Sequence, residues 1–129
     1  MPDYEIELVY FGRDYHHETI IGILTGHSLD DILAQCPRGR EIWYTRDYLE
    51  TFRKLGFNVN PRFKKFDPET PWPCIMRCHC TIGKDTYWYG WVYYKGRVYD
   101  TSNREFSFDE WIDIYGKRFR VTSMLQVWI

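Results

Sequence analysis

The clearest pattern in the chain is a dense alternation of large residues near its middle. The stretch Thr86–Asp100 is interpreted as two β-strands joined at Lys95-Gly96. Successive side chains of a strand point to opposite faces, and here both faces carry aromatic or aliphatic residues. We therefore expect a central sheet that is either covered on both faces or leaves one aromatic face open for binding.

The same alternation predicts further strands on both sides of this centre. They are expected over Tyr4–Phe11, Phe57–Val59, Cys74–Ile82 and Phe119–Trp128. Between the second and third of these, four prolines predict a surface connection without regular structure. The positions concerned are Pro61, Pro68, Pro71 and Pro73, and the basic residues among them are interpreted as solvated charges: Arg62, Lys64 and Lys65.

Helical periodicity and terminal signals predict four helices. The first helix is expected from His16 to Gly26, and the third from Thr45 to Gly56. The second begins at the capping pair Ser28 and Asp31. The fourth begins at the capping pair Ser107 and Glu110 and ends at Gly116. Three helices precede most of the strands, which indicates the α+β class. We expect one domain over residues 1–129, with N-terminal helices packed on a twisted, mostly antiparallel sheet.

Composition and charge indicate which classes of partner and which cellular compartment to expect. The 129 residues include 17 basic and 18 acidic side chains, so no overall field attracts nucleic acid or an anionic membrane. There is no apolar run near the roughly 20 residues of a membrane span, and no secretion signal is recognised at the N-terminus. A cytoplasmic protein without a cofactor is expected, and the four cysteines agree with a reducing compartment.

The cysteine-rich segment C-I-M-R-C-H-C first suggests a metal site. In an extended strand, however, Cys74, Cys78 and Cys80 share one face while His79 points to the other. We therefore expect no metal there, and buried thiols instead. Cys36 follows a helix end, whereas a helix N-terminus is the position that activates a thiol.

Polar residues gather at the start of the first helix. Asp14, His16, His17 and Glu18 are suited to helix capping, and equally contain the groups of a metal or acid–base site. The residue types alone leave these alternatives open.

Four passages together resemble the small papain-like cysteine peptidases of the bacteriocin-processing type. They are I-L-T-G-H-S-L-D-D-I-L (Ile23–Leu33), C-P-R-G (Cys36–Gly39), Y-L-E-T-F-R-K-L-G-F (Tyr48–Phe57) and W-V-Y-Y-K-G-R-V-Y-D (Trp91–Asp100). Their order and spacing carry the resemblance, which implies a papain-like fold.

The resemblance also implies where the catalytic residues of the family would fall. The nucleophilic cysteine corresponds to His16, the base histidine to Gly90 and the orienting acid to Asp100. The glutamine of the oxyanion hole corresponds to Tyr10 or Phe11. Only the acid matches, so the alignment implies a domain without thiol proteolysis.

We therefore expect a catalytically inactive papain-like domain that binds a protein or a small ligand. The expected binding residues beside the vestigial positions are His17, Trp88, Tyr89 and Trp91. The resemblance further suggests an accessory protein of a phage or mobile element. The alternative is an active cysteine peptidase or other hydrolase, with Cys36 or Cys80 paired with His27 or His79, or with His16, His17 and Asp100 in a different hydrolytic site.

Overall fold

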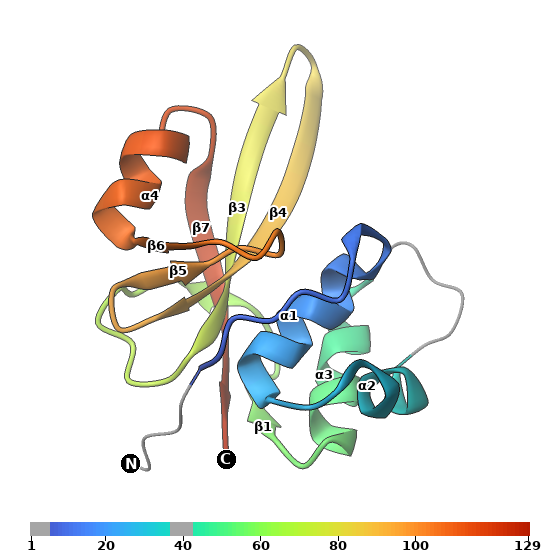
Figure 1. Ribbon diagram of the computed structural model, residues 1–129. Coiled ribbons are helices and arrows are strands. Elements are labelled where there is room, and N and C mark those ends of the chain that lie inside the picture. The colour runs from blue at the N-terminus through green and yellow to red at the C-terminus, as the bar shows by residue number, and fades with distance from the viewer. Residues whose placement is uncertain (1–5, 37–42) are drawn as a thin grey trace.

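The computed structural model describes residues 6–36 and 43–129, and it has an α+β architecture (Figure 1). A 3₁₀ turn, Arg13–Tyr15, leads into three helices, which are α1 (His16–Thr25), α2 (Leu29–Gln35) and α3 (Thr45–Lys54). The strands follow, with one helix among them: β1 (Asn58–Val59), β2 (Lys64–Lys65), β3 (Cys74–Ile82), β4 (Asp85–Tyr94), β5 (Arg97–Tyr99), β6 (Glu105–Ser107), α4 (Phe108–Tyr115) and β7 (Arg120–Trp128).

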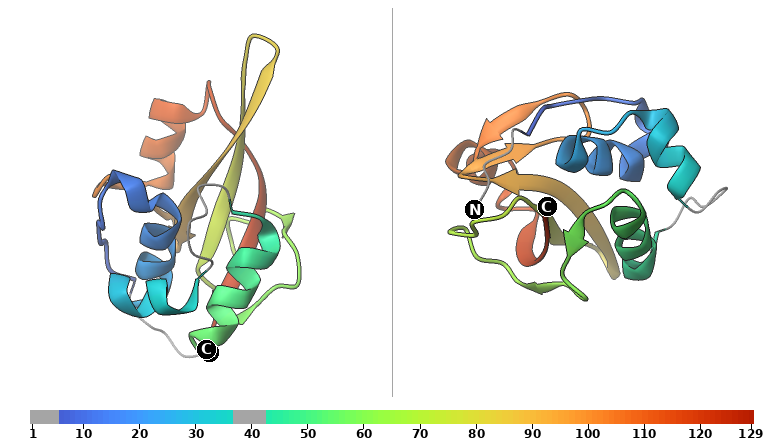
Figure 2. Two further views of the ribbon diagram at one scale, coloured as in Figure 1. Left: turned by 90° about the vertical axis from the view of Figure 1, so that its right-hand side faces the viewer. Right: turned by 90° about the horizontal axis from the view of Figure 1, so that it is seen from below.

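The strands form one open, seven-stranded sheet. Its order is β1-β7-β3-β4-β5-β6, with β2 paired to another part of β7, and all of these pairings are antiparallel. Figures 1 and 2 show α1, α2 and α3 grouped on one side of the sheet and α4 on the other. The centre of the sheet is therefore covered on both faces.

Strand β4 illustrates how alternation builds this two-sided core. Val92 and Tyr94 belong to the cluster formed with α1–α3, whereas Trp91 and Tyr93 belong to the cluster formed with α4. Toward the hairpin tip the same strand extends beyond the helices that cover its two faces, and residues 85–89 are exposed. The predicted aromatic ribbon is thus buried at its inner half, and its outer half projects from the molecule (Figure 1).

Most predicted elements are confirmed, several of them through their terminal chemistry. The Ser28 and Ser107 side chains accept hydrogen bonds from Asp31 N and Glu110 N, as the capping signals predicted. At the predicted hairpin turn, Lys95 and Gly96 both have positive φ values, 48° and 76°. Two such residues form the turn that matches the twist of paired strands.

Three details of the sequence prediction are wrong. In the described part of Tyr4–Phe11 there is no strand, because the segment crosses α1 and its apolar side chains pack on the helix-side core. The proline-rich connection contains the short strand β2, since Lys64 and Lys65 meet the edge of β7. A further strand, β6, precedes α4 and pairs with β5.

Helix α1 packs against the N-terminal segment on one side and against β4 on the other, and a glycine permits each contact. A Cβ at Gly22 would lie 2.5 Å from the Phe11 ring of the N-terminal segment. A Cβ at Gly90 on β4 would lie 3.3 Å from both Ile20 Cδ1 and Ile75 Cγ2. Both glycines therefore allow a closer approach than an alanine would.

No helix within the described residues has the length and apolar character needed to cross a bilayer. The longest, α1 and α3, have 10 residues each, about half of a typical membrane span.

Two tryptophans of β4 that are close in sequence differ strongly in burial. Trp91 is 7% exposed and packs against Trp111 and Phe119, whereas Trp88 is 56% exposed. We expect Trp91→Ala to lower the free energy of unfolding by about 3–5 kcal/mol. Trp88→Ala should lower it by less than about 1 kcal/mol, because it removes only partly exposed ring contacts. Urea denaturation of both variants tests this, and equal losses would contradict the described burial.

Candidate functional site

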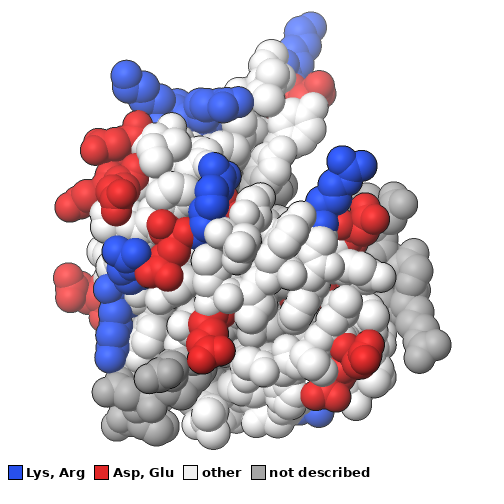
Figure 3. All heavy atoms as spheres, viewed as in Figure 1, with Lys and Arg blue, Asp and Glu red and all other residues white. Residues whose placement is uncertain are grey.

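The sequence-predicted positions His16 and Gly90 line one pocket of about 470 Å³. Its walls come from the first turn of α1, the start of α3, and the middle of β3 and β4. The space-filling view shows a notch between the projecting hairpin and the start of the helical region (Figure 3). Segments distant in sequence thus meet at a single cleft.

His16 is held at the edge of this pocket by the β5–β6 connection. Its Nδ1 lies 3.0 Å from the Thr101 hydroxyl oxygen, a contact across 85 positions of the chain. Burial lowers the pKa of His16 below its ordinary value of 6.5, and the charge of Asp100 opposes part of that shift. The neutral imidazole is therefore favoured near pH 7.

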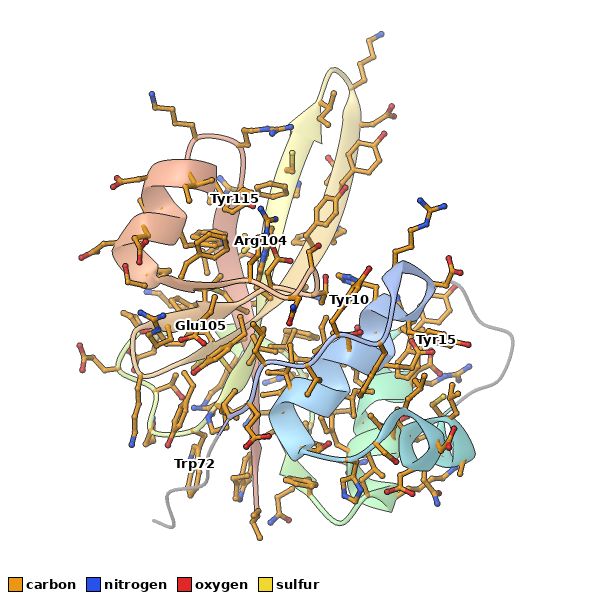
Figure 4. All side chains as sticks on the ribbon, in the orientation of Figure 1. Tyr10, Tyr15, Trp72, Arg104, Glu105 and Tyr115 are labelled. Carbon is orange, nitrogen blue, oxygen red and sulfur yellow. The ribbon has the colours of Figure 1, made fainter. Side chains whose placement is uncertain are left out.

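The carboxylate of Asp100 is itself engaged by its own loop. It accepts hydrogen bonds from Ser102 N at 3.1 Å and from the Arg104 guanidinium at 2.8 Å. Arg104 also donates to the Tyr115 hydroxyl, and these two side chains lie together in Figure 4. Asp100 thus acts on His16 through space, while Thr101 makes the direct contact.

Gly90 faces the start of the helical layer rather than an open gap. The Ile20 and Ile75 side chains approach the position that a Cβ of residue 90 would take, and the pocket begins beside them.

His17 belongs to an aromatic cluster on the α3 side of the pocket. Its ring stacks on Trp43 with centroids 5.3 Å apart, and its Nδ1 is hydrogen-bonded to the Tyr48 hydroxyl. Burial raises the pKa of Tyr48, and the charges of Glu18 and Asp47 raise it further. The phenol therefore keeps its proton, and it can donate it in the hydrogen bond to a neutral His17.

Arg77 is the cation of the pocket, and the sequence analysis missed it. Its guanidinium lies between the rings of Phe63 and Trp88, with the central carbon 4.1 Å and 5.0 Å from their centroids. Its Nε donates to Ser123 Oγ at 2.9 Å. Arg77 is the one lysine or arginine of β3, which was the available signal, but the sequence analysis considered only the cysteines and the histidine of this strand.

The expected aromatic binding residues divide between two faces. Trp88 lines the pocket and is 56% exposed, whereas the ring of Tyr89, 44% exposed, packs with Phe119 and Trp91 on the α4 side although the residue borders the pocket. Trp91 is a correction, because its side chain is buried under α4 and is not available to a ligand. Aromatic residues that the sequence analysis did not single out complete the lining: Trp43, Tyr44, Tyr48 and Phe63.

The thiols lie away from this pocket. Cys74 and Cys78 are buried in the α4-side core, Cys80 is 4% exposed, and burial raises the pKa of Cys78 to about 12. The His79 ring contacts the Trp88 ring, with centroids 4.8 Å apart, on the opposite face of the sheet, as the strand alternation predicted. Within residues 6–36 and 43–129, no group of three His, Cys, Asp or Glu side chains is arranged to hold a metal ion.

The lowered pKa of His16 predicts a pH-dependent stability. Between the pKa of the folded state and 6.5, the unfolded chain takes up the His16 proton more readily than the folded chain does. Acidification through this window should therefore destabilise the native protein more than the His16→Gln variant. Urea unfolding of both proteins at pH 7.5 and 5.5 measures the effect. A difference between them that is independent of pH would contradict it.

Comparison of the chain with protein-family models, with curated proteins and with solved structures found no match. The fold is therefore stated from the structure itself, as N-terminal helices followed by an open antiparallel sheet.

Proposed function

We propose that this protein is a non-catalytic binding domain, with a papain-like arrangement, whose ligand occupies the cleft between α1 and β4. The observation that carries the proposal is the composition of the pocket wall. His16 and Gly90, the positions to which the resemblance assigns the nucleophile and the base, both line it, and no cysteine is among the described lining residues.

A binding role is supported by the combination of shape and exposed rings. The pocket volume of about 470 Å³ is within the range typical of small-molecule sites. Trp88 and Tyr44 line the pocket and are 56% and 60% exposed. Rigid aromatic rings of this kind give large contact area at low entropic cost, as recognition surfaces require.

A rearranged thiol hydrolase has less support. Cys80 and its neighbour His79 point to opposite faces of β3, so they cannot act together without a bulge between them. His27 and Cys36 flank the opposite ends of α2, which at seven residues is about 10 Å long. These pairings do not place a thiol and an imidazole in one cleft.

A fragment screen on ¹⁵N-labelled protein tests the proposal. We expect the bound fragments to shift the signals of the Gly90 amide and of the Trp43 and Trp88 indoles. They should shift Lys95 and Gly96 less, although these line another surface depression. In Trp88→Ala the affinity of the same fragments should fall several-fold, because the variant loses one wall of the pocket.

Two results would contradict the proposed function. If the fragments bind at Lys95 and Gly96 and do not shift the signals of the α1–β4 cleft, the cleft is not the binding site. Rapid alkylation of one cysteine by iodoacetamide at pH 6 would reveal an activated thiol. That result would favour the alternative function, a cysteine-dependent enzyme.

A further inference from the structure

The pocket between α1 and β4 has a charge imbalance on its wall. Its described lining residues include one arginine and two histidines but no aspartate or glutamate. Acidic groups stand behind the lining rather than in it: Glu18 and Asp47 act electrostatically on Tyr48, and Asp100 is paired with Arg104. The lining is therefore suited to a ligand that supplies a negative charge.

Arg77 is the group that would meet this charge. Its guanidinium carbon lies over the rings of Phe63 and Trp88, and Ser123 Oγ accepts a hydrogen bond from its Nε. No salt bridge involving Arg77 occurs among the described residues, and its Nη groups have no hydrogen-bond partner there. The two Nη atoms form the edge of the guanidinium that can donate two parallel hydrogen bonds to a carboxylate.

Partial burial strengthens the case for an anionic ligand. Burial lowers the pKa of Arg77, because the surrounding rings replace water that would solvate the charge. Arginine nevertheless stays protonated, so the cost of its desolvation persists in the empty site. A bound anion would offset that cost, and a neutral ligand of the same shape would not.

The remaining surface of the pocket favours a flat, apolar body on the ligand. The stacked His17–Trp43 pair forms one wall, and the half-exposed ring of Trp88 also lines the pocket. A carboxylate that pairs edge-on with a guanidinium lies in the same plane as it. An aromatic ring attached to that carboxylate can extend in this plane along the rings of the pocket.

We propose that the cleft binds a small aromatic carboxylic acid, with the carboxylate on the Nη edge of Arg77 and the ring between the aromatic walls. This inference rests on the proposed binding function and specifies its ligand class. It assigns to Arg77 the recognition of charge and to Trp43 and Trp88 the recognition of the ring.

The test compares 2-naphthoate with its neutral analogue 2-naphthamide by NMR titration of the tryptophan indole signals. For the unmodified protein we expect the acid to bind at least about tenfold more tightly than the amide, as a charge-assisted bidentate contact implies. In Arg77→Gln this ratio should fall to about one, while the amide still binds. Arg53→Gln, which changes an exposed arginine of α3 outside the pocket, should keep the original ratio.

The outcomes separate this inference from the proposed function. Equal binding of acid and amide to the unmodified protein would overturn the role of the anion and leave the cleft as a binding site. A preference for the acid that survives in Arg77→Gln would overturn the assignment to Arg77. If neither compound shifts the Trp43 or Trp88 indole, the ligand class is wrong, and the fragment screen alone then decides whether the cleft binds.

Discussion

The packing of α1 against β4 is the contact on which the site depends. Ile20 reaches the backbone of Gly90 so closely that a single added carbon would crowd it. This approach brings the first turn of α1 beside the middle of the sheet, and it thereby places His16 and Gly90 in one pocket. On the other side of the helix, the Phe11 ring lies still closer to Gly22, where a Cβ would be only 2.5 Å from it. The helix is thus fixed from both sides, and the cleft is a consequence of that fixation.

The two halves of the aromatic ribbon serve different purposes. Its inner half supplies the core, where Trp91 and Tyr93 pack with α4 while Val92 and Tyr94 pack with the N-terminal helices. Its outer half extends beyond the helices on both faces, and there the exposed ring of Trp88 borders the pocket rather than filling the interior. Arg77 lies opposite Gly90 in the β3–β4 pairing, at the point where the ribbon changes from one role to the other.

Local signals in the sequence were sufficient for most elements, because caps, turn glycines and alternation act over a few residues. The hairpin at Lys95-Gly96 and the caps at Ser28 and Ser107 are of this kind. The N-terminal segment was mistaken for a strand, because its alternation of Ile6, Leu8 and Tyr10 has no sheet partner; the side chains that pack on the helix-side core are Ile6, Leu8, Val9 and Phe11. Likewise, the pairing of Arg77 with Phe63 and the approach of Trp43 to His17 join distant parts of the chain, and no local pattern encodes them.

A double-mutant cycle between Gly90→Ala and Ile20→Val tests the α1–β4 contact most directly. Ile20→Val removes Cδ1, one of the two side-chain atoms that an alanine methyl at position 90 would approach at 3.3 Å. The account predicts that the double variant is more stable than the sum of the single effects implies, by about 0.5 kcal/mol or more in urea unfolding. Additivity of the two effects within about 0.3 kcal/mol would contradict it, because α1 would then not rest on β4 at this glycine.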